Sequence, residues 1–406
     1  MITPSFSPTA TERVLPKLAL DFTTASLDPR VTFTRATSAS NPATYVASTG
    51  YVTNATNNQP RFDYNPVTLA CKGLLIEESR ANLILYSGDL SNAFWNRWQC
   101  AVTQNATTSP SNTLTAAKLY SNSGQVGNLY KGITLTATSY TLSIYAKAAG
   151  YSWILLGAAT AGNSGVWFNV SSGTVGTQSA GYTGKIENVG NNWYRCSVTF
   201  TATAASWNVI VFSTNQDNVL SVGNGTSGIY IWGAQLEAGA FATSYIPTTT
   251  TALTRNADVA TMTGTNFSSW WTATTGGTTV SVIPKSISGT SPLFQMDDNT
   301  ANNIISLRGN VANPELYIKA TTDQAQIDAG TIVANTAYKL SGAWNTNSCA
   351  AAQNGTSVVE DTSATIPTVT QARIGSDGTN YANAWIQKIS YWPQRLINPE
   401  VQAFSK

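Results

Sequence analysis

The sequence contains no histidine, and this absence excludes several kinds of site at once. Ser-His-Asp and Cys-His catalytic arrangements, zinc sites with histidine ligands and histidine-based pH switches all require an imidazole. Charge is scarce as well, because Asp, Glu, Lys and Arg make up only 10% of the 406 residues, against about 25% in a typical soluble domain. The net charge of +2 comes without a basic run, so we expect no nucleic-acid partner.

Long apolar runs and clustered cysteines are also missing. No stretch of about 18 apolar residues occurs, which predicts no membrane insertion. Residues 1–10 lack the basic start and apolar centre of a signal peptide, so none is expected. The four cysteines are scattered without Cys-x-x-Cys spacing, which favours free buried thiols over a disulfide framework. They are Cys71, Cys100, Cys196 and Cys349.

The residues that replace charge are Thr, Ser, Asn, Gly and Ala. Hydrophobic residues still make up 42% of the chain, which is enough for substantial cores, and 406 residues favour two or three domains. An uncharged polar surface of this kind suits β-rich proteins that work outside cells or inside a larger assembly.

The stretch 228–248 predicts the end of one domain. Its first half alternates with apolar residues on both faces, which is typical of a strand inside a sheet. One face would carry Tyr230, Trp232, Ala234 and Leu236, and the other Ile229 and Ile231. Gly239, Pro247 and a run of threonines follow, so the strand should lead into a linker.

The rest of the chain predicts an all-β protein made of tandem antiparallel β-sandwiches. Residues 140–147 and 193–200 alternate cleanly, Gly and Asn mark turns between short strands, and Asn354-Gly355 predicts a hairpin. The first sandwich is expected to be a jelly roll. The only predicted helix is short and terminal, beginning at Asn398 with a proline in its first turn and ending near Phe404.

We expect five segments along the chain. They are an extended arm at 1–17, which holds three prolines, a small β cap at 18–88, the jelly roll at 89–247, a linker at 248–254 and a second sandwich at 255–406.

The predicted cap holds Arg35, Arg61, Glu77, Glu78 and Arg80 in a chain otherwise poor in charge. These acids could be catalytic, or the group could form an internal network of ion pairs. We favour the network.

Several motifs resemble a known family. Phe-Thr-Arg-Ala at 33–36, Arg-Phe-Asp-Tyr at 61–64 and Gly-Leu-Leu-Ile-Glu-Glu at 73–78 resemble the start of phage tail-fibre and head-spike proteins. The run 230–237 with Ser-Tyr-Ile-Pro at 244–247 resembles the closing strand of the carbohydrate-binding-module-like jelly roll of the same family.

The C-terminal third resembles a different fold family. Ala-Trp at 343–344, Gln-Asn-Gly at 353–355, Arg-Ile-Gly at 373–375 and the run 396–401 are similar to a concanavalin A-like, or laminin G-like, sandwich. This pattern marks a fold that serves many functions.

The phage resemblance implies a bacteriophage virion protein that is made in the host cytoplasm. It would serve as a fibre, spike or adhesin on the tail or capsid and would bind host surface polysaccharide. The N-terminal region would attach to other virion proteins, and the family implies a homo-oligomer such as a trimer. The alternatives are a purely structural decoration protein and a capsule polysaccharide depolymerase.

Sugar binding commonly pairs aromatic rings with amide and carboxylate groups, and the chain has 12 Trp and 17 Tyr. The candidate carbohydrate-binding residues are Trp153, Trp167 and Trp207 on the first sandwich and Trp271, from the Trp270-Trp271 pair, on the second. Trp153, Trp167 and Trp207 could instead be core residues, since buried aromatics dominate such cores. The Trp270-Trp271 pair could instead be an interface anchor, because tryptophan is favoured at interface hot spots.

No residues are assigned as catalytic or as metal ligands. Glycoside hydrolysis needs two carboxylates on a common site, and neighbouring acids on a strand point to opposite faces. The candidate neighbours are Glu77 with Glu78, Asp297 with Asp298, and Glu360 with Asp361. No cofactor is expected, although a structural calcium ion could use oxygen atoms of Asp297, Asp298, Asn299 and Asp377.

Overall fold

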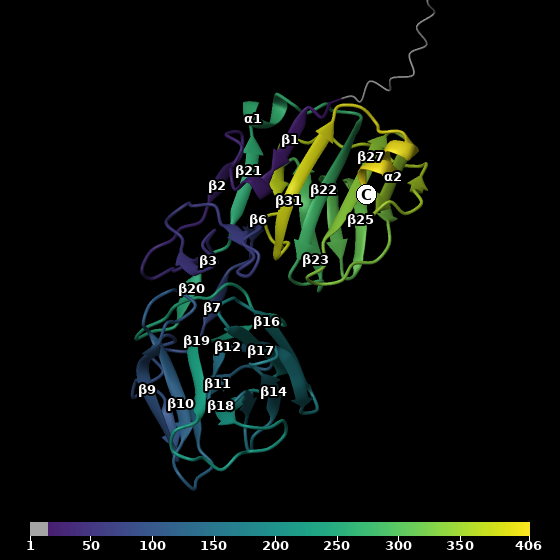
Figure 1. Ribbon diagram of the computed structural model, residues 1–406. Helices are drawn as coiled ribbons and strands as arrows, with labels where there is room; N and C mark the ends of the chain where they lie inside the picture. The colour runs from purple at the N-terminus through teal and green to yellow at the C-terminus, as the bar shows by residue number, and fades with distance from the viewer. Residues whose placement is uncertain (1–14) are drawn as a thin grey trace, which may run out of the picture.

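The computed structural model describes residues 15–406 and contains two antiparallel β-sandwiches, one placed above the other in Figure 1. This arrangement confirms the predicted all-β fold. The predicted arm at 1–17 lies almost wholly outside the described residues. Across residues 15–406, no helix has both the length and the apolar character needed to cross a membrane.

The first sandwich is built from two sheets of six strands each. The sheets have the orders β16-β17-β12-β19-β10-β9 and β15-β14-β13-β18-β11-β8, and the chain crosses between them several times, as in a jelly roll. The strands are β8 (Asn96–Trp98), β9 (Cys100–Thr107), β10 (Ala116–Ser121), β11 (Asn128–Leu135), β12 (Ser139–Ala149), β13 (Trp153–Ala159), β14 (Gly165–Asn169), β15 (Thr174–Gln178), β16 (Tyr182–Asn188), β17 (Tyr194–Thr201), β18 (Ala205–Thr214) and β19 (Gly228–Ala238).

The second sandwich has a sheet in the order β29-β28-β27-β22-β31-β6-β5, with β1 also paired to β31, and a sheet in the order β2-β21-β30-β23-β24-β25-β26. Its later strands are β21 (Val259–Thr263), β22 (Gly276–Pro284), β23 (Thr290–Asp297), β24 (Asn303–Asn310), β25 (Asn313–Ala320), β26 (Thr322–Asp328), β27 (Tyr338–Asn345), β28 (Ser348–Gln353), β29 (Val359–Asp361), β30 (Gln371–Ile374) and β31 (Ala384–Trp392).

The region predicted as a separate cap is instead largely part of the second sandwich. Its strands β1 (Leu18–Asp21), β5 (Phe62–Tyr64) and β6 (Cys71–Ile76) join the first sheet of that sandwich, and β2 (Thr32–Thr34) pairs with β21. Figure 1 shows β1 beside β31, although the two strands are far apart in the sequence. Their apolar residues enter one common core, and this shared burial explains why the cap has no core of its own.

The hairpin of β3 (Thr44–Val46) and β4 (Val52–Asn54) stands outside the sheets of the two sandwiches. It lies at the junction between the two sandwiches, where β7 (Arg80–Asn82) also pairs with β20 (Leu253–Arg255). The segment predicted as a linker is therefore partly a strand. Its first residue, Thr248, is 4% exposed and donates from Oγ1 to the Ile84 carbonyl at 2.5 Å.

The predicted terminal helix is present as α2 (Asn398–Phe404), and its first turn is closed by Glu400, which accepts a hydrogen bond from the Ile397 amide at 3.0 Å. The structure adds a single-turn helix, α1 (Thr265–Ser268), and a short 3-10 turn, η1 (Phe22–Thr24). Asn354 and Gly355 both have positive φ in the turn between β28 and β29, as the hairpin prediction requires. The four cysteines are free, as predicted; Cys100, Cys196 and Cys349 are buried, whereas Cys71 is half-buried.

Candidate functional site

The site begins with an irregularity in β19. Gly233 has φ of +65°, and the pairing of β12 with β19 slips between Ser143 and Tyr145, so that the strand contains a β-bulge. Before the bulge Ile229 and Ile231 point into the core, and after it Ala234 and Leu236 do so. The sequence-based assignment of Trp232, Ala234 and Leu236 to one face was therefore wrong, because the extra residue changes the alternation.

Trp232 lies opposite Ile231, on the outer face of the sheet, where three aromatic rings cluster. The Trp232 ring centroid lies 4.7 Å from that of Tyr245 and 5.3 Å from that of Tyr145. The Tyr245 hydroxyl lies 2.7 Å from Ser87 Oγ, and burial raises the pKa of Tyr245. This cluster gives the outer face a rigid aromatic floor.

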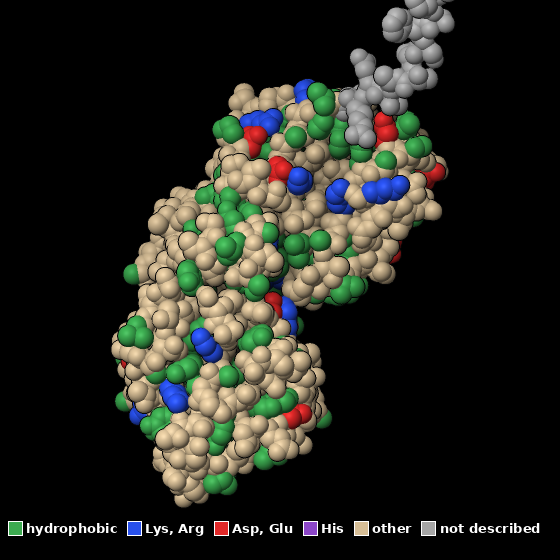
Figure 2. Space-filling model, viewed as in Figure 1, with side chains coloured by type: hydrophobic (Ala, Val, Ile, Leu, Met, Phe, Trp, Pro, Cys, Tyr) green, Lys and Arg blue, Asp and Glu red, His purple; other side chains and the backbone are tan. Residues whose placement is uncertain are grey.

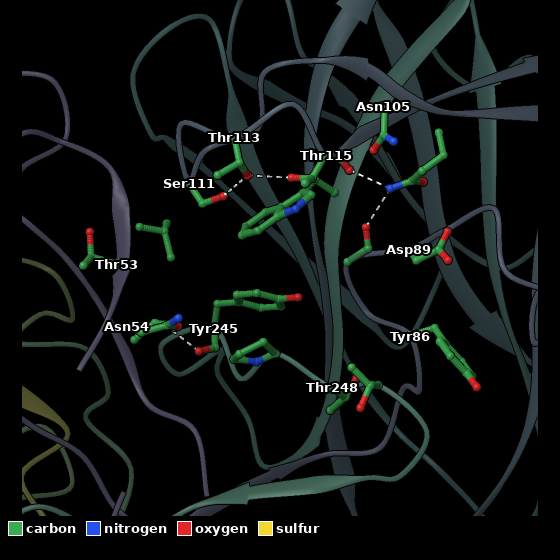
Figure 3. A pocket seen from close by; sticks show the side chains of 17 residues that line it. Thr53, Asn54, Tyr86, Asp89, Asn105, Ser111, Thr113, Thr115, Tyr245 and Thr248 are labelled. Carbon is green, nitrogen blue, oxygen red and sulfur yellow. Dashed lines mark hydrogen bonds between the residues drawn. The ribbon is translucent and has the colours of Figure 1, made fainter. Parts of the chain in front are cut away.

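A groove of about 760 Å³ lies over this floor, between the first sandwich and the β3–β4 hairpin. Figure 3 shows Thr53 and Asn54 of the hairpin on one side, Tyr86 and Asp89 on the other, and a row of hydroxyl-bearing residues along the top. The lining consists of Thr44, Val52, Thr53, Asn54, Tyr86, Gly88, Asp89, Gln104, Asn105, Ser111, Thr113, Thr115, Trp232, Tyr245, Pro247, Thr248 and Thr249. The groove thus combines aromatic rings with many uncharged polar groups.

One wall carries a closed ring of four hydroxyl groups. Neighbouring oxygens are separated by 2.9 Å from Ser109 to Ser111, 2.8 Å from Ser111 to Thr113, 2.9 Å from Thr113 to Thr115 and 2.9 Å from Thr115 back to Ser109. In three of these four contacts either oxygen can be the donor. Because each hydroxyl has one hydrogen and Thr115 donates to Ser109, closing the ring uses all four hydrogens and leaves acceptor oxygens for the groove.

Gln104 lies beside this ring and is held in one orientation. Its Nε2 donates to the Gly88 carbonyl at 3.1 Å and to the Thr115 carbonyl at 2.7 Å, while its Oε1 is buried and has no hydrogen-bond partner among the described residues. A buried acceptor without a partner costs roughly 1–3 kcal/mol, so a donor from a ligand or from water would be stabilising here.

The base of the groove is held by buried ion pairs at the junction of the two sandwiches. Arg61 donates to the Thr44 carbonyl at 3.0 Å and to Ser244 Oγ at 2.6 Å, and it pairs with Glu77 at 2.9 Å and with Asp258. The backbone amide and the hydroxyl of Ser244 in turn donate to Glu77. Arg61 therefore connects the β3–β4 hairpin to the segment that follows β19.

Other charged residues complete this junction cluster. Arg35 pairs with Asp258 at 2.6 Å, while Lys285 and Arg255 pair with Glu77 at 2.6 and 3.5 Å. Burial alone would raise the pKa of Glu77, but the nearby Lys285, Arg255 and Arg61 hold it well below its usual value. Arg35, Arg61 and Glu77 therefore belong to an internal ion-pair network, as predicted, and this network extends into the second sandwich. Glu78 and Arg80, which were predicted to join it, instead pair with each other and are partly exposed.

The four tryptophans predicted to bind sugar lie elsewhere. Trp153 and Trp167 come together on the outer face of the β13–β14 sheet, where Trp167 is 6% exposed in a small apolar cluster. Trp207 packs against Phe200, with ring centroids 5.2 Å apart, at the first core. Trp271 stacks on Phe267 and packs against the second core. None of the four lines the groove described above.

The groove's own residues had only a weak signal in the sequence. Trp232 stood in a conspicuous strand, but regular alternation assigned it to the same face as Leu236, which is a core residue. The hydroxyl residues 109–115 cannot be singled out in a chain so rich in Ser and Thr.

The other acids considered for chemistry or calcium are engaged by protein groups. Asp297 accepts hydrogen bonds from Gln371 at 2.6 Å and from Arg373 at 2.9 Å, and Asp377 accepts from the Thr379 amide at 2.8 Å. Within residues 15–406, no three Cys, Asp or Glu side chains form a group that could hold a metal ion.

No protein-family model matches the sequence, and no curated protein matches it either. Solved structures show partial likenesses. A carbohydrate-binding module (CBM40) of the Ruminococcus gnavus IT-sialidase, bound to α2,3-sialyllactose, has a TM-score of 0.29 and 13% identity, covering 33% of this chain and 84% of that one. Domain 4 of the Geobacillus stearothermophilus arabinanase AbnA, in complex with arabinotriose, has a TM-score of 0.28 and 14% identity, covering 41% and 81%.

A mutant of the NanB sialidase from Streptococcus pneumoniae gives a TM-score of 0.30 at 13% identity, over 35% of this chain and 26% of that chain. Each of these likenesses covers only part of the chain, and the fold described above rests on the chain's own strand pairings.

Proposed function

We propose that this protein binds glycans without acting on them, and that the groove between the first sandwich and the β3–β4 hairpin is the binding site. The observation that carries this proposal is the combination of an aromatic floor, formed by Trp232 and Tyr245, with walls of hydroxyl and amide groups. Aromatic rings pack against the apolar faces of sugar rings, while hydroxyl and amide groups bind the sugar hydroxyls.

A binding role fits this groove better than hydrolysis. Retaining and inverting glycosidases commonly place two carboxyl groups on either side of the bond that they cleave. Among the described residues that line the groove, Asp89 is the one carboxylate. Its Oδ1 is already engaged by the Ser91 amide at 3.1 Å and the Ser91 hydroxyl at 2.7 Å.

We further propose that the protein is a phage virion component, a fibre, spike or adhesin, that presents this groove to host surface polysaccharide as a homo-oligomer. The motifs at 33–36, 61–64 and 73–78 support this proposal by their resemblance to phage fibre and head-spike proteins. A surface with few charged groups, seen in Figure 2, also suits a particle-bound protein. Several copies on one particle would raise a weak affinity per site.

The test is a glycan array probed with the purified full chain, followed by calorimetric titration of each glycan that binds. Tyr86→Ala removes a partly buried aromatic wall of the groove and should weaken binding by about 10-fold or more, equivalent to about 1.4 kcal/mol. Trp153→Ala is the matched control, because Trp153 lies on the outer face of the other sheet.

Three outcomes would contradict the proposal. Loss of binding in Trp153→Ala but not in Tyr86→Ala would move the site to the other sheet. An array without any bound glycan would favour a purely structural decoration role, and release of reducing sugar from host polysaccharide would show an enzyme.

A further inference from the structure

We infer that the groove selects uncharged, polyhydroxylated glycans and rejects anionic ones such as sialylated or uronic acid chains. This inference rests on the proposed glycan-binding function and concerns the chemical class of its ligand. It follows from three features of the lining: its charge, its ring of hydroxyl groups and the side-chain oxygen of Gln104, which has no hydrogen-bond partner among the described residues.

The charge of the lining disfavours an anion. The described residues around the groove include no lysine or arginine, and the one ionisable acid is Asp89. A sugar carboxylate is normally held by a charge-assisted hydrogen bond, often from arginine in a paired geometry. In this groove such a group would meet the Asp89 carboxylate and gain no cationic partner.

The cationic groups at the junction face elsewhere. Lys72, Lys285 and Arg195 line a neighbouring recess of about 110 Å³, which shares Thr44, Val52 and Tyr245 with the groove. The Arg61 guanidinium donates to Thr44, Ser244 and the buried carboxylates, and it does not line the groove. The groove surface therefore carries no cationic group, although cations lie behind its base.

The hydroxyl ring favours groups that donate hydrogen bonds. Ser111, Thr113 and Thr115 line the groove, and the closed ring uses their hydrogens, so their oxygens remain as acceptors. A sugar hydroxyl can donate to these oxygens, whereas an ionised carboxylate or sulfate only accepts and finds no free donor in the ring.

The Oε1 atom of Gln104, which has no hydrogen-bond partner among the described residues, also favours uncharged glycans. Its amide nitrogen is fixed by two carbonyls, and the buried oxygen has no hydrogen-bond partner among the described protein groups. A hydroxyl or an acetamido N–H that reached this oxygen would satisfy it, whereas an anionic group would place two acceptors against each other. A donor is therefore favoured over an acceptor at this wall.

The experiment compares neutral and anionic probes on the same full-length protein. The neutral probes are maltoheptaose, mannopentaose and N-acetylchitohexaose, and the anionic probes are 3′-sialyllactose and hexagalacturonate. We expect binding among the neutral probes only, with less than about a 2-fold change in affinity between 50 and 500 mM NaCl, because screening acts on charged contacts.

Thr113→Val tests the hydroxyl ring itself. The change preserves the branched shape of an exposed side chain and removes one hydroxyl, so affinity should fall by about 5- to 10-fold. Thr183→Val, on the exposed face of β16 and outside the groove, is the matched control and should retain the affinity of the parent protein.

Binding confined to the anionic probes, or a steep loss of affinity with salt, would overturn the inference while leaving a glycan-binding function in place. Equal affinities for Thr113→Val and Thr183→Val would also overturn it, because the hydroxyl ring would then not contact the ligand. The absence of binding to any glycan on the wider array would overturn the proposed function, and this inference with it.

Discussion

Replacing Glu77 with glutamine should strongly destabilise the junction between the two sandwiches. Glu77 is fully buried and is the one carboxylate within 4.0 Å of Lys285 and Arg255 among the described residues. Glutamine keeps the size of the side chain but removes its charge, so two buried cations lose their counterion. Breaking a buried ion pair in this way costs about 3–5 kcal/mol, a large part of the roughly 5–15 kcal/mol that stabilises a typical protein.

The expected change can be measured by calorimetry or by urea unfolding at pH 7. For a sandwich of this size, 1 kcal/mol shifts Tm by about 2–4 °C, so Glu77→Gln should lower Tm by about 6–20 °C. Glu78→Gln is the matched control. Glu78 pairs with Arg80 at 2.5 Å, but its side chain is 33% exposed, and such pairs contribute about 1 kcal/mol or less. Equal effects of the two substitutions would refute the reasoning.

The pH dependence gives a second check on the same cluster. Burial raises the pKa of Glu77, but Lys285, Arg255 and Arg61 outweigh it and lower the pKa well below its usual value. Because the folded pKa lies below the unfolded value of about 4.3, the stabilisation is complete above that pH and is lost as the pH falls towards the folded pKa. The Tm difference between the parent protein and Glu77→Gln should therefore narrow below about pH 4. A constant difference down to pH 3 would contradict this assignment.

Three further predictions concern the groove and the cores. Gly233→Ala should lower the free energy of unfolding by about 1–3 kcal/mol and alter tryptophan fluorescence, because a Cβ added at φ +65° would lie 2.9 Å from the Tyr145 ring. An unchanged Tm would contradict the bulge. Cys100 and Cys349 should resist alkylation by iodoacetamide at pH 8 until the protein unfolds, because burial raises the pKa of each thiol to about 11. Rapid alkylation of either thiol in the folded protein would contradict this prediction. The third prediction concerns a first sandwich produced without residues 15–79, whose fold is checked by its β circular dichroism. It should bind glycan at least about 10-fold more weakly than the full chain, because it lacks the hairpin wall of the groove. Full affinity would place the ligand elsewhere.

The strands were predictable because their signal is local. Residues 140–147 and 193–200 alternate with period two, and both lie in long strands of the first sandwich. The ion-pair network could be anticipated for a related reason. In a chain with so little charge, several acids and arginines close together in the sequence have to be paired if they are buried.

Strand partners and the bulge had no comparable local signal. β1 pairs with β31 across almost the whole chain, and sequence order alone suggested a separate cap. A single extra residue at Gly233 reversed the faces of the second half of β19, and a glycine in a strand does not by itself distinguish a bulge from a close backbone contact. The groove depends on both features, which explains why its aromatic floor was not selected from the sequence.

The junction and the groove are physically one unit. The carbonyl of Thr44, which lines the groove, is held by Arg61, and the same guanidinium is fixed by Glu77 and Asp258. Thr44 Oγ1 also donates to the carbonyl of Tyr245 at 2.5 Å, so the hairpin is attached directly to the aromatic floor. Because these bonds connect the two sandwiches, the position of the groove wall depends on how they are docked. Several of the chain's few charged groups are therefore placed where they fix the shape of a binding surface that has no cation of its own.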